Sequence, residues 1–326
     1  MTSTEIAART NRLPASGWLE NVLRSLGIRG RTLVIALPFF WLLLFFVVPF
    51  LIVLWVSTAF LTTAKPPYTH IGDAGTFTLN IGDSFGRLFS DALYIKAYFN
   101  SLVVAAVSTM LCLVIAYPLA YGMARCGKST RNILLMLVIL PFWTSFLIRV
   151  YAWIGLLKNN GLINSALLAI DGWLTAHLGI DLMAGPINMM NTNFAVYLGI
   201  VYSYLPFMIL PLYANLEKMD MSLLEAATDL GCRPLKAFFV ITVPLSFPGI
   251  VAGSMLVFIP AVGEYVIPEL LGGPSSLMIG RVLWNEFFSN RDWPTASAVA
   301  IAILLALVVP LMIYQKFQDK ELEKQS

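Results

Sequence analysis

One stretch of this chain matches a nucleotide-binding pattern at every required position. Residues 122–129 read G-M-A-R-C-G-K-S, which fits the phosphate-binding loop G-x4-G-K-S. A working loop of this kind follows a β-strand and opens a helix, so that its backbone N–H groups surround the phosphates. Here a long apolar run precedes the pattern, and another follows it closely. We therefore interpret Lys128 as part of a basic anchor beside a membrane span, and we expect no nucleotide site.

Enzyme chemistry and metal binding have little support in the sequence. The two histidines, His70 and His177, lie in expected loops without neighbouring ligands, and neither H-E-x-x-H nor G-x-S-x-G occurs. Cys112, Cys126 and Cys232 have no metal-ligand or disulfide spacing. We expect no catalytic residue, metal or cofactor. A membrane enzyme or receptor stays a minor alternative, which a buried cluster of His, Asp and Glu would have supported.

Two charged residues, Arg149 and Glu264, interrupt otherwise apolar runs. Charges inside membrane spans are costly and usually face the bundle interior or a water-filled path. Arg149 can instead extend its guanidinium toward the outer headgroups. Glu264 follows Gly263 and Pro260, which suit a helix that lines a cavity. Two interpretations of Glu264 stay open: it contacts a cationic substrate, or it forms an ion pair with Arg149.

Many aromatic residues are expected near the outer side of the membrane, at about the same depth as Arg149 and Glu264. Most are expected in the aromatic belt at the membrane–water interface. A subset beside a carboxylate would suit an organic cation through cation–π contact. The sequence leaves open which rings belong to that subset. Our candidates for the substrate path, together with Glu264, are Tyr151, Trp153, Tyr202, Tyr265 and Trp284.

A short polar helix is predicted between two apolar runs. Ser222 and Glu225 fit a capping box, in which each side chain binds a free backbone N–H of the first turn. Gly231 is placed to end the helix in a left-handed conformation, and Pro234 can open the next helix. One face of the helix is apolar and flanked by acids, which suits either a lipid interface or a docked partner. That face carries Leu223, Ala226, Ala227 and Leu230, beside Glu225 and Asp229.

Composition places these motifs in a polytopic membrane protein. The chain of 326 residues is 58% hydrophobic and only 12% charged. A helical span needs about 20 mostly apolar residues, and each long uncharged run can hold one. The first run is long enough to span and lacks the cleavage pattern of a signal peptide. The six predicted spans cover residues 33–60, 98–124, 133–157, 193–215, 247–268 and 294–315.

Basic residues set the predicted orientation. With the N-terminus inside, fourteen Lys and Arg residues lie in inner segments and six in outer ones, and Arg149 completes the total of 21. The positive-inside rule therefore places both termini in the cytoplasm. The 222–231 helix is then cytoplasmic as well. The net charge of +3 reflects this bias, so we expect no nucleic-acid partner.

The cytoplasmic helix also carries a family resemblance. The pattern E-A-A-x3-G-x9-I-x-L-P resembles the signature of permease subunits of bacterial ATP-binding-cassette (ABC) importers, with Val243 in place of the usual Leu. In that family the segment is a coupling helix that docks into a groove on a separate ATPase subunit. The resemblance implies coupling roles for Ser222, Glu225, Ala226, Ala227 and Gly231. It also implies a type-1 (MetI-like) permease core.

Further segments are similar to the polyamine-importer permeases, in particular those for putrescine and spermidine. They are residues 130–135, 141–153, 157–161, 258–274 and 285–294, within a likeness that runs from about residue 33 to 315. This resemblance implies four partners besides the lipid bilayer: an ATPase dimer, a second related permease, a periplasmic polyamine-binding protein and the polyamine itself. It leaves putrescine and spermidine undistinguished.

We therefore expect an all-α, multi-pass inner-membrane protein with six transmembrane helices that imports polyamine, foremost putrescine, by alternating access. The alternative within this class is a permease for another small solute, such as an amino-acid derivative or an iron carrier. A secondary transporter is disfavoured because no inverted-repeat hydropathy is visible. The predicted parts are a cytoplasmic tail (1–32), the first transmembrane helix (33–60), a periplasmic loop (61–97), a permease core (98–315) with a cytoplasmic coupling loop (216–246), and a cytoplasmic tail (316–326).

Overall fold

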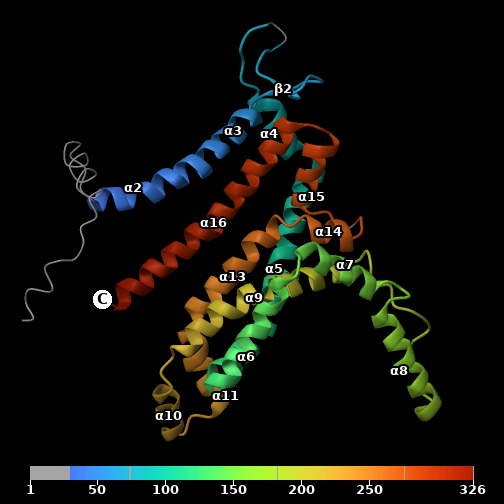
Figure 1. Cartoon of the computed structure of the whole chain (residues 1–326), viewed down its shortest axis with the longest axis vertical. Helices are drawn as coiled ribbons and strands as arrows, with labels where there is room; N and C mark the ends of the chain where they lie inside the picture. The colour runs from blue at the N-terminus through green and yellow to red at the C-terminus, as the bar shows by residue number, and fades with distance from the viewer. Residues whose placement is uncertain (1–29, 73–74, 182, 275, 326) are drawn as a thin grey trace, which may run out of the picture. The chain divides into compact units, whose positions relative to one another are not determined.

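The structure is a computed structural model that describes residues 30–72, 75–181, 183–274 and 276–325 (Figure 1). The chain divides into two compact units, Met1–Val56 and Ser57–Ser326. Helices dominate both, which confirms the predicted fold class. Nearly all of the predicted 1–32 tail lies outside the described residues.

The described part of the first unit is one nearly continuous helix. It consists of α2 (Gly30–Leu42), η1 (Leu43–Val47) and α3, which runs from Val48 to Ser57 at the start of the second unit. The η1 segment is a single π-helical turn that ends two residues before Pro49. Because proline has no N–H and its ring crowds the preceding turn, a widened turn there keeps the helix going. The helix matches the predicted first span.

The second unit begins with a small hairpin and then becomes helical throughout. The hairpin pairs β1 and β2 in antiparallel register, with Phe60 opposite Thr69. In chain order its elements are β1 (Phe60–Leu61), β2 (Tyr68–Thr69), α4 (Ile81–Ser90), α5 (Ala92–Arg125), α6 (Lys128–Ile139), η2 (Leu140–Trp143), α7 (Phe146–Leu157), α8 (Leu162–Leu178), α9 (Asn193–Glu217), α10 (Ser222–Asp229), α11 (Pro234–Ala237), η3 (Phe238–Thr242), α12 (Val243–Leu245), α13 (Phe247–Val262), α14 (Val266–Leu271), α15 (Ile279–Trp284), η4 (Asn285–Ser289) and α16 (Trp293–Gln325).

Helices α5, α9 and α13 pack together and form the core of this unit. Small buried residues let the backbones approach, including Ala116 and Ala120 on α5. At Gly253 on α13 the approach is so close that a Cβ would lie 2.8 Å from the Met208 sulfur and 3.0 Å from its carbonyl oxygen. Such small-residue contacts are typical of helix packing in membranes, where van der Waals contact replaces the hydrophobic effect.

Four helices are individually long and apolar enough to span a membrane, and two bent helix pairs raise the total to six. The four are Val34–Ser57, Ala92–Arg125, Asn193–Glu217 and Trp293–Met312. One pair joins Lys128–Trp143 to Phe146–Leu178 with a bend of 91°, and the other joins Pro234–Leu245 to Phe247–Val262 with a bend of 64°. Six spans are therefore present among the described residues if each bent pair crosses once.

Two predicted spans differ from the observed helices. The prediction of one helix over 133–157 is wrong, because the chain breaks at Thr144 and Ser145. There the Thr144 hydroxyl and N–H both donate to the Pro141 carbonyl, at 2.9 and 3.3 Å, which closes the turn. The predicted helix over 247–268 is interrupted as well, since α13 ends at Val262 and α14 starts at Val266. Residues 263–265, here called the Glu264 connection, join the two.

The second unit has two ends, on opposite sides of its core. Helices α10 and α11 lie at one end of the α5–α9–α13 core, and α4 with the hairpin lies at the opposite end (Figure 1). We call these the α10 end and the α4 end. The described part of the predicted 61–97 loop contains β2, α4 and the start of α5.

Candidate functional site

The start of α10 differs from its prediction. The predicted capping box of Ser222 and Glu225 is wrong, because Met221 occupies the N-cap position and no side-chain capping bond forms there. Instead, the Asp220 carboxylate accepts the Ser222 N–H at 2.9 Å. This contact from the residue before the cap replaces the expected one. The hydrogen bonds from Ser222 also lower the pKa of Asp220.

The end of α10 has the predicted left-handed glycine. Gly231 has φ +76°, and its N–H donates to the Thr228 carbonyl at 2.9 Å. The Cys232 N–H donates to the Ala227 carbonyl, also at 2.9 Å. These two bonds form a Schellman motif, which satisfies the last carbonyls of the helix. Pro234 then opens α11, as predicted.

The segment from α10 to η3 has several exposed apolar side chains. Ala227 is buried, whereas Ser222, Glu225, Ala226 and Gly231 are exposed. We define the α10 surface by four exposed apolar side chains. They are Leu223 (46% exposed), Leu230 (89%), Leu235 (76%) and Phe239 (65%). Exposed apolar side chains of this size are candidates for contact with a partner or with lipid.

Glu264 lies outside the helices, in the connection between α13 and α14, and its carboxylate is only 7% exposed. The Tyr204 hydroxyl donates to its Oε2 at 2.5 Å. Its Oε1 accepts the Val266 and Ile267 N–H groups at 3.1 and 3.4 Å. The carboxylate thereby caps α14, where a negative charge also interacts favourably with the helix dipole. These contacts involve only uncharged donors, so the negative charge itself is not neutralised.

Close backbone packing holds this connection in place. A Cβ on Gly280 of α15 would lie 2.4 Å from the Gly263 carbonyl oxygen and 2.7 Å from that of Glu264. Only a glycine permits this approach without displacing the backbone. The position of Glu264 therefore depends on α15 as well as on α13 and α14.

The aromatic candidates separate into two pairs and one isolated residue. Trp153 on α7 meets Tyr202 on α9 edge to face, with ring centroids 5.3 Å apart. Tyr265 stacks on Trp284, with centroids 4.4 Å apart and planes 16° from parallel. Tyr151 is 58% exposed on α7. Only Tyr265 and Trp284 are thus joined to the connection that carries Glu264.

Arg149 forms no ion pair with Glu264 among the salt bridges of the described residues. Its Nε and Nη1 atoms are enclosed and have no hydrogen-bond partner. The guanidinium carbon lies 5.7 Å from the Phe142 ring centroid and 5.8 Å from that of Phe146. Two aromatic rings therefore lie within about 6 Å of this cation, and the ion-pair interpretation of Glu264 does not describe this structure.

The segment that matches a phosphate-binding loop has a different structure. Gly122 to Arg125 are the last residues of α5, and Lys128 is the first residue of α6. The pattern therefore spans a two-residue turn between helices. Near that turn, Arg131 pairs with Glu217 at 2.7 Å and joins α6 to the end of α9. Among the described residues, no group of three or more His, Cys, Asp and Glu side chains is arranged to hold a metal.

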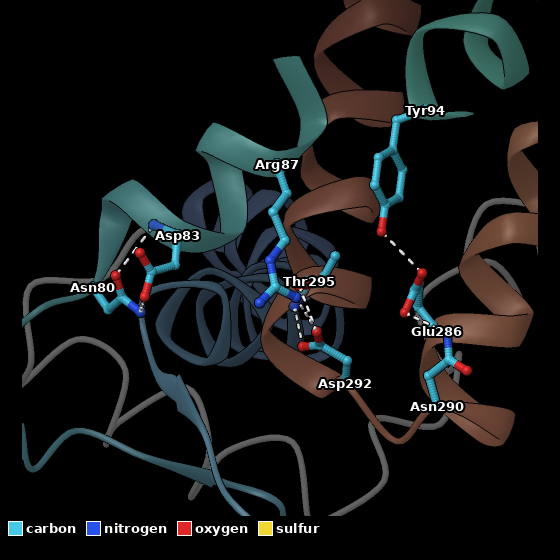
Figure 2. A network of polar contacts seen from close by, with 8 residues as sticks. All are labelled: Asn80, Asp83, Arg87, Tyr94, Glu286, Asn290, Asp292 and Thr295. Carbon is cyan, nitrogen blue, oxygen red and sulfur yellow. Dashed lines mark hydrogen bonds and ion pairs between the residues drawn. The ribbon is translucent and has the colours of Figure 1, made fainter. Parts of the chain in front are cut away.

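Polar contacts at the α4 end hold η4 and the start of α16 (Figure 2). Arg87 of α4 pairs with Asp292 at 3.1 Å, and Asp292 caps α16 by accepting the Thr295 N–H and hydroxyl. The Tyr94 hydroxyl of α5 donates to Glu286 at 2.9 Å. These contacts tie η4, and with it the neighbouring aromatic side chains, to α4 and α5.

The path candidates did not include Tyr204 or Gly280. Tyr204 lies two residues from the candidate Tyr202, on a different face of the same helix. A tyrosine inside an apolar span was a usable signal, because its hydroxyl needs a partner when buried. Gly280 gave no such signal, since its role depends on a contact with residues distant in sequence.

Comparison with known proteins agrees with this architecture. Residues 116–324 match the family model described as binding-protein-dependent transport system inner membrane component. The spermidine/putrescine transport system permease protein PotB of Haemophilus influenzae is 39% identical over 86% of this chain and 92% of its own length. PotB of Escherichia coli K12 is 39% identical over 84% of this chain and 92% of its own length.

A solved structure shares the fold at low sequence identity. It is a bacterial ABC transporter involved in the import of the acidic polysaccharide alginate, with a TM-score of 0.65 and 18% identity. The match covers 93% of this chain and 99% of that chain. Together with the family match over more than half of the sequence, these findings show that the chain belongs to the binding-protein-dependent transport system inner membrane components, the ABC type-1 permeases.

Proposed function

We propose that this chain is one of two permease subunits of an ATP-driven polyamine importer, with putrescine as its principal cargo. The observation that carries the proposal is the identity of about 40% to spermidine/putrescine permeases over most of both chains. A charged, flexible cargo also suits a membrane path with an unneutralised carboxylate beside aromatic rings. Cargo would pass from a periplasmic binding protein into the membrane path and then to the cytoplasm.

The energy would come from a separate ATPase dimer that docks on the α10 surface. The backbone ends of α10 are satisfied within the chain, so its exposed leucines and Phe239 are free to contact a partner. Closure of the ATPase dimer would then move α10 and α11, and through η3 and α12 the core helix α13. The chain itself would hydrolyse no ATP, because its phosphate-loop pattern lies in a helix end and a short turn.

The orientation follows from the distribution of basic residues. Lys128 and Arg131 lie at the start of α6, and Lys218, Arg233 and Lys236 surround α10. By the positive-inside rule, the α10 end faces the cytoplasm and the α4 end faces the periplasm. Native cysteines allow a direct check. A membrane-impermeant maleimide should label Cys232 only after the cells are opened, whereas a Thr63→Cys variant should be labelled in intact cells.

The central test is transport by the reconstituted complex. The chain would be co-expressed with its neighbouring ATPase, second permease and binding protein, purified, and placed in proteoliposomes that contain ATP. Radiolabelled putrescine should accumulate only when the binding protein is added to the outer side. Unlabelled spermidine and an uncharged diol of similar length would measure selectivity. Uptake of a different solute class, with no putrescine uptake, would refute the proposal.

A further inference from the structure

A row of aromatic rings begins beside Glu264 and leads toward the α4 end. Tyr265, the next residue in the chain, stacks on Trp284 of α15 with ring centroids 4.4 Å apart. The Trp284 ring in turn contacts the Phe288 ring of η4, with centroids 4.0 Å apart. Trp284 is 39% exposed and Phe288 is 54% exposed, so these rings keep accessible surface. Three rings in consecutive contact therefore begin at the residue that follows a buried glutamate.

The row continues to a hollow at the α4 end. The ring centroids of Phe288 and Phe287 lie 4.9 Å apart. Phe287 stacks on Trp293, with centroids 5.1 Å apart and planes 3° from parallel. These three rings line a hollow of about 920 Å³, together with the 61–67 segment. Lys65 and Arg291 line the same hollow. Because these two cations repel an ammonium group, it binds less well in the hollow than on Tyr265 and Trp284 at the other end of the row.

The charges along the row favour a cation at its Glu264 end. Glu269 of α14 forms an ion pair with Arg281, so that carboxylate is already neutralised. Glu264, in contrast, accepts only from a hydroxyl and two backbone N–H groups. A ring face attracts an ammonium group by its quadrupole, and an adjacent uncompensated carboxylate adds to that attraction. The opposite end of the row, with Lys65 and Arg291, lacks this combination.

We propose that Tyr265, Trp284 and Phe288 form a binding site for the ammonium end of an aliphatic amine, held beside Glu264. The inference rests on the proposed polyamine function and selects, among the aromatic candidates, the rings that contact the cargo. Trp153 and Tyr202 form a separate pair, and no ring contact among the described residues links that pair to the row. Scattered rings of an interfacial belt need no such run of consecutive contacts beginning beside a buried glutamate.

The test compares two tryptophans of the same chain. In the reconstituted complex, Trp284→Leu should raise the KM for putrescine about three- to thirty-fold, the range expected for one cation–π contact. Trp284→Phe keeps a ring and should recover most of the affinity. Trp173→Leu is the matched control, because Trp173 of α8 is an exposed tryptophan outside the path candidates and its ring stacks on His177. Its KM should stay within about twofold of the unchanged protein.

A binding measurement separates this inference from the proposed function. Calorimetry on the purified complex, with putrescine as the titrant and the binding protein omitted, should show heat that Trp284→Leu weakens and Trp173→Leu preserves. If the unchanged complex transports putrescine and Trp284→Leu alters neither KM nor binding, the ring site is refuted while the function stands. If Trp284-dependent binding occurs without transport, the ring site stands and the proposed function fails.

Discussion

The α10 surface and the Glu264 connection both interrupt the series of long apolar helices, but they differ in which side chains are exposed. At α10 the apolar side chains are exposed, and Leu230 is 89% accessible. At the connection a carboxylate is buried and held by Tyr204 and the first turn of α14. The first arrangement leaves apolar area accessible, and the second keeps a carboxylate inside the protein.

This contrast indicates where each site is sensitive. The backbone of α10 is stabilised within the chain, so substitutions of its exposed side chains should leave folding intact and change only an interface. The Glu264 connection depends on α9, α14 and α15 together, so substitutions there can affect packing and cargo at once. Separating these effects requires variants that preserve shape at the connection and change chemistry at α10.

The largest expected effect is at α10. Glu225→Lys reverses an exposed charge in the first turn, where a cation opposes the helix dipole by about 0.3–1 kcal/mol. Gly231→Pro cannot adopt φ +76° and removes the N–H that binds the Thr228 carbonyl. We expect both to reduce uptake and substrate-stimulated ATPase activity by more than about tenfold at near-normal membrane levels, since a change of about 1.4 kcal/mol at a docked interface is tenfold.

Asp229→Asn is the control for this prediction, because Asp229 is an exposed acid in the last turn of the same helix. Removing a negative charge there favours the helix dipole slightly, so uptake and ATPase rate should stay near normal. Immunoblots of membrane fractions would establish protein levels. Normal ATP-coupled uptake in both Glu225→Lys and Gly231→Pro would contradict the coupling role.

Much of this contrast was accessible from the sequence, and the exceptions have physical causes. The left-handed Gly231 and the opening Pro234 were predicted, because both depend on local backbone geometry. The Ser222 capping box was not formed, because Asp220 supplied a competing acceptor just before the helix. The breaks after Trp143 and Val262 were missed, since apolar periodicity continues through them. The contacts of Glu264 with Tyr204 and Gly280 were beyond prediction, since they join elements distant in the chain.

The next effect in size is at Glu264. Glu264→Gln keeps the shape and the acceptor oxygen that caps α14 but removes the charge. Assembly should therefore be preserved while putrescine uptake falls about tenfold, the equivalent of about 1.4 kcal/mol of lost attraction. Because Arg149 makes no ion pair with Glu264 in this structure, adding Arg149→Met should not restore uptake. Uptake kinetics of the single and double variants measure this directly.

Recovery in the double variant would instead show that the two charges pair in another state of the transport cycle, since removing one partner of a buried pair strands the other. Wild-type KM and rate in Glu264→Gln would exclude a substrate role for this carboxylate. Arg149→Met alone provides the reference for the double variant.

A smaller effect is expected from the hydroxyl that holds Glu264. Tyr204→Phe removes the donor to Oε2 and leaves the backbone contacts of Oε1 in place. A hydrogen bond to a charged group contributes about 1.5–3 kcal/mol, and retention of the other contacts places the loss near the lower end. We expect a reduced melting temperature of the purified complex and a change in KM of several fold. Tyr202→Phe is the matched control, because Tyr202 lies on the same helix and contacts Trp153 through its ring.

The smallest effect is expected at Lys128. Unlike Glu225 and Gly231, this residue should be replaceable without loss of ATPase activity. If ATP binds only to the separate ATPase, Lys128→Ala should leave the ATPase rate of the complex within about twofold, since loss of one exposed surface charge changes local energies by under about 1 kcal/mol. The lysine begins α6, directly after the two-residue turn that follows α5. Arg131→Ala is the comparison, because it breaks the ion pair with Glu217 and should lower stability more than Lys128→Ala does. A photoaffinity ATP analogue that labels residues 122–129 of the purified chain would overturn this assignment and move an energy-coupling site into the permease itself.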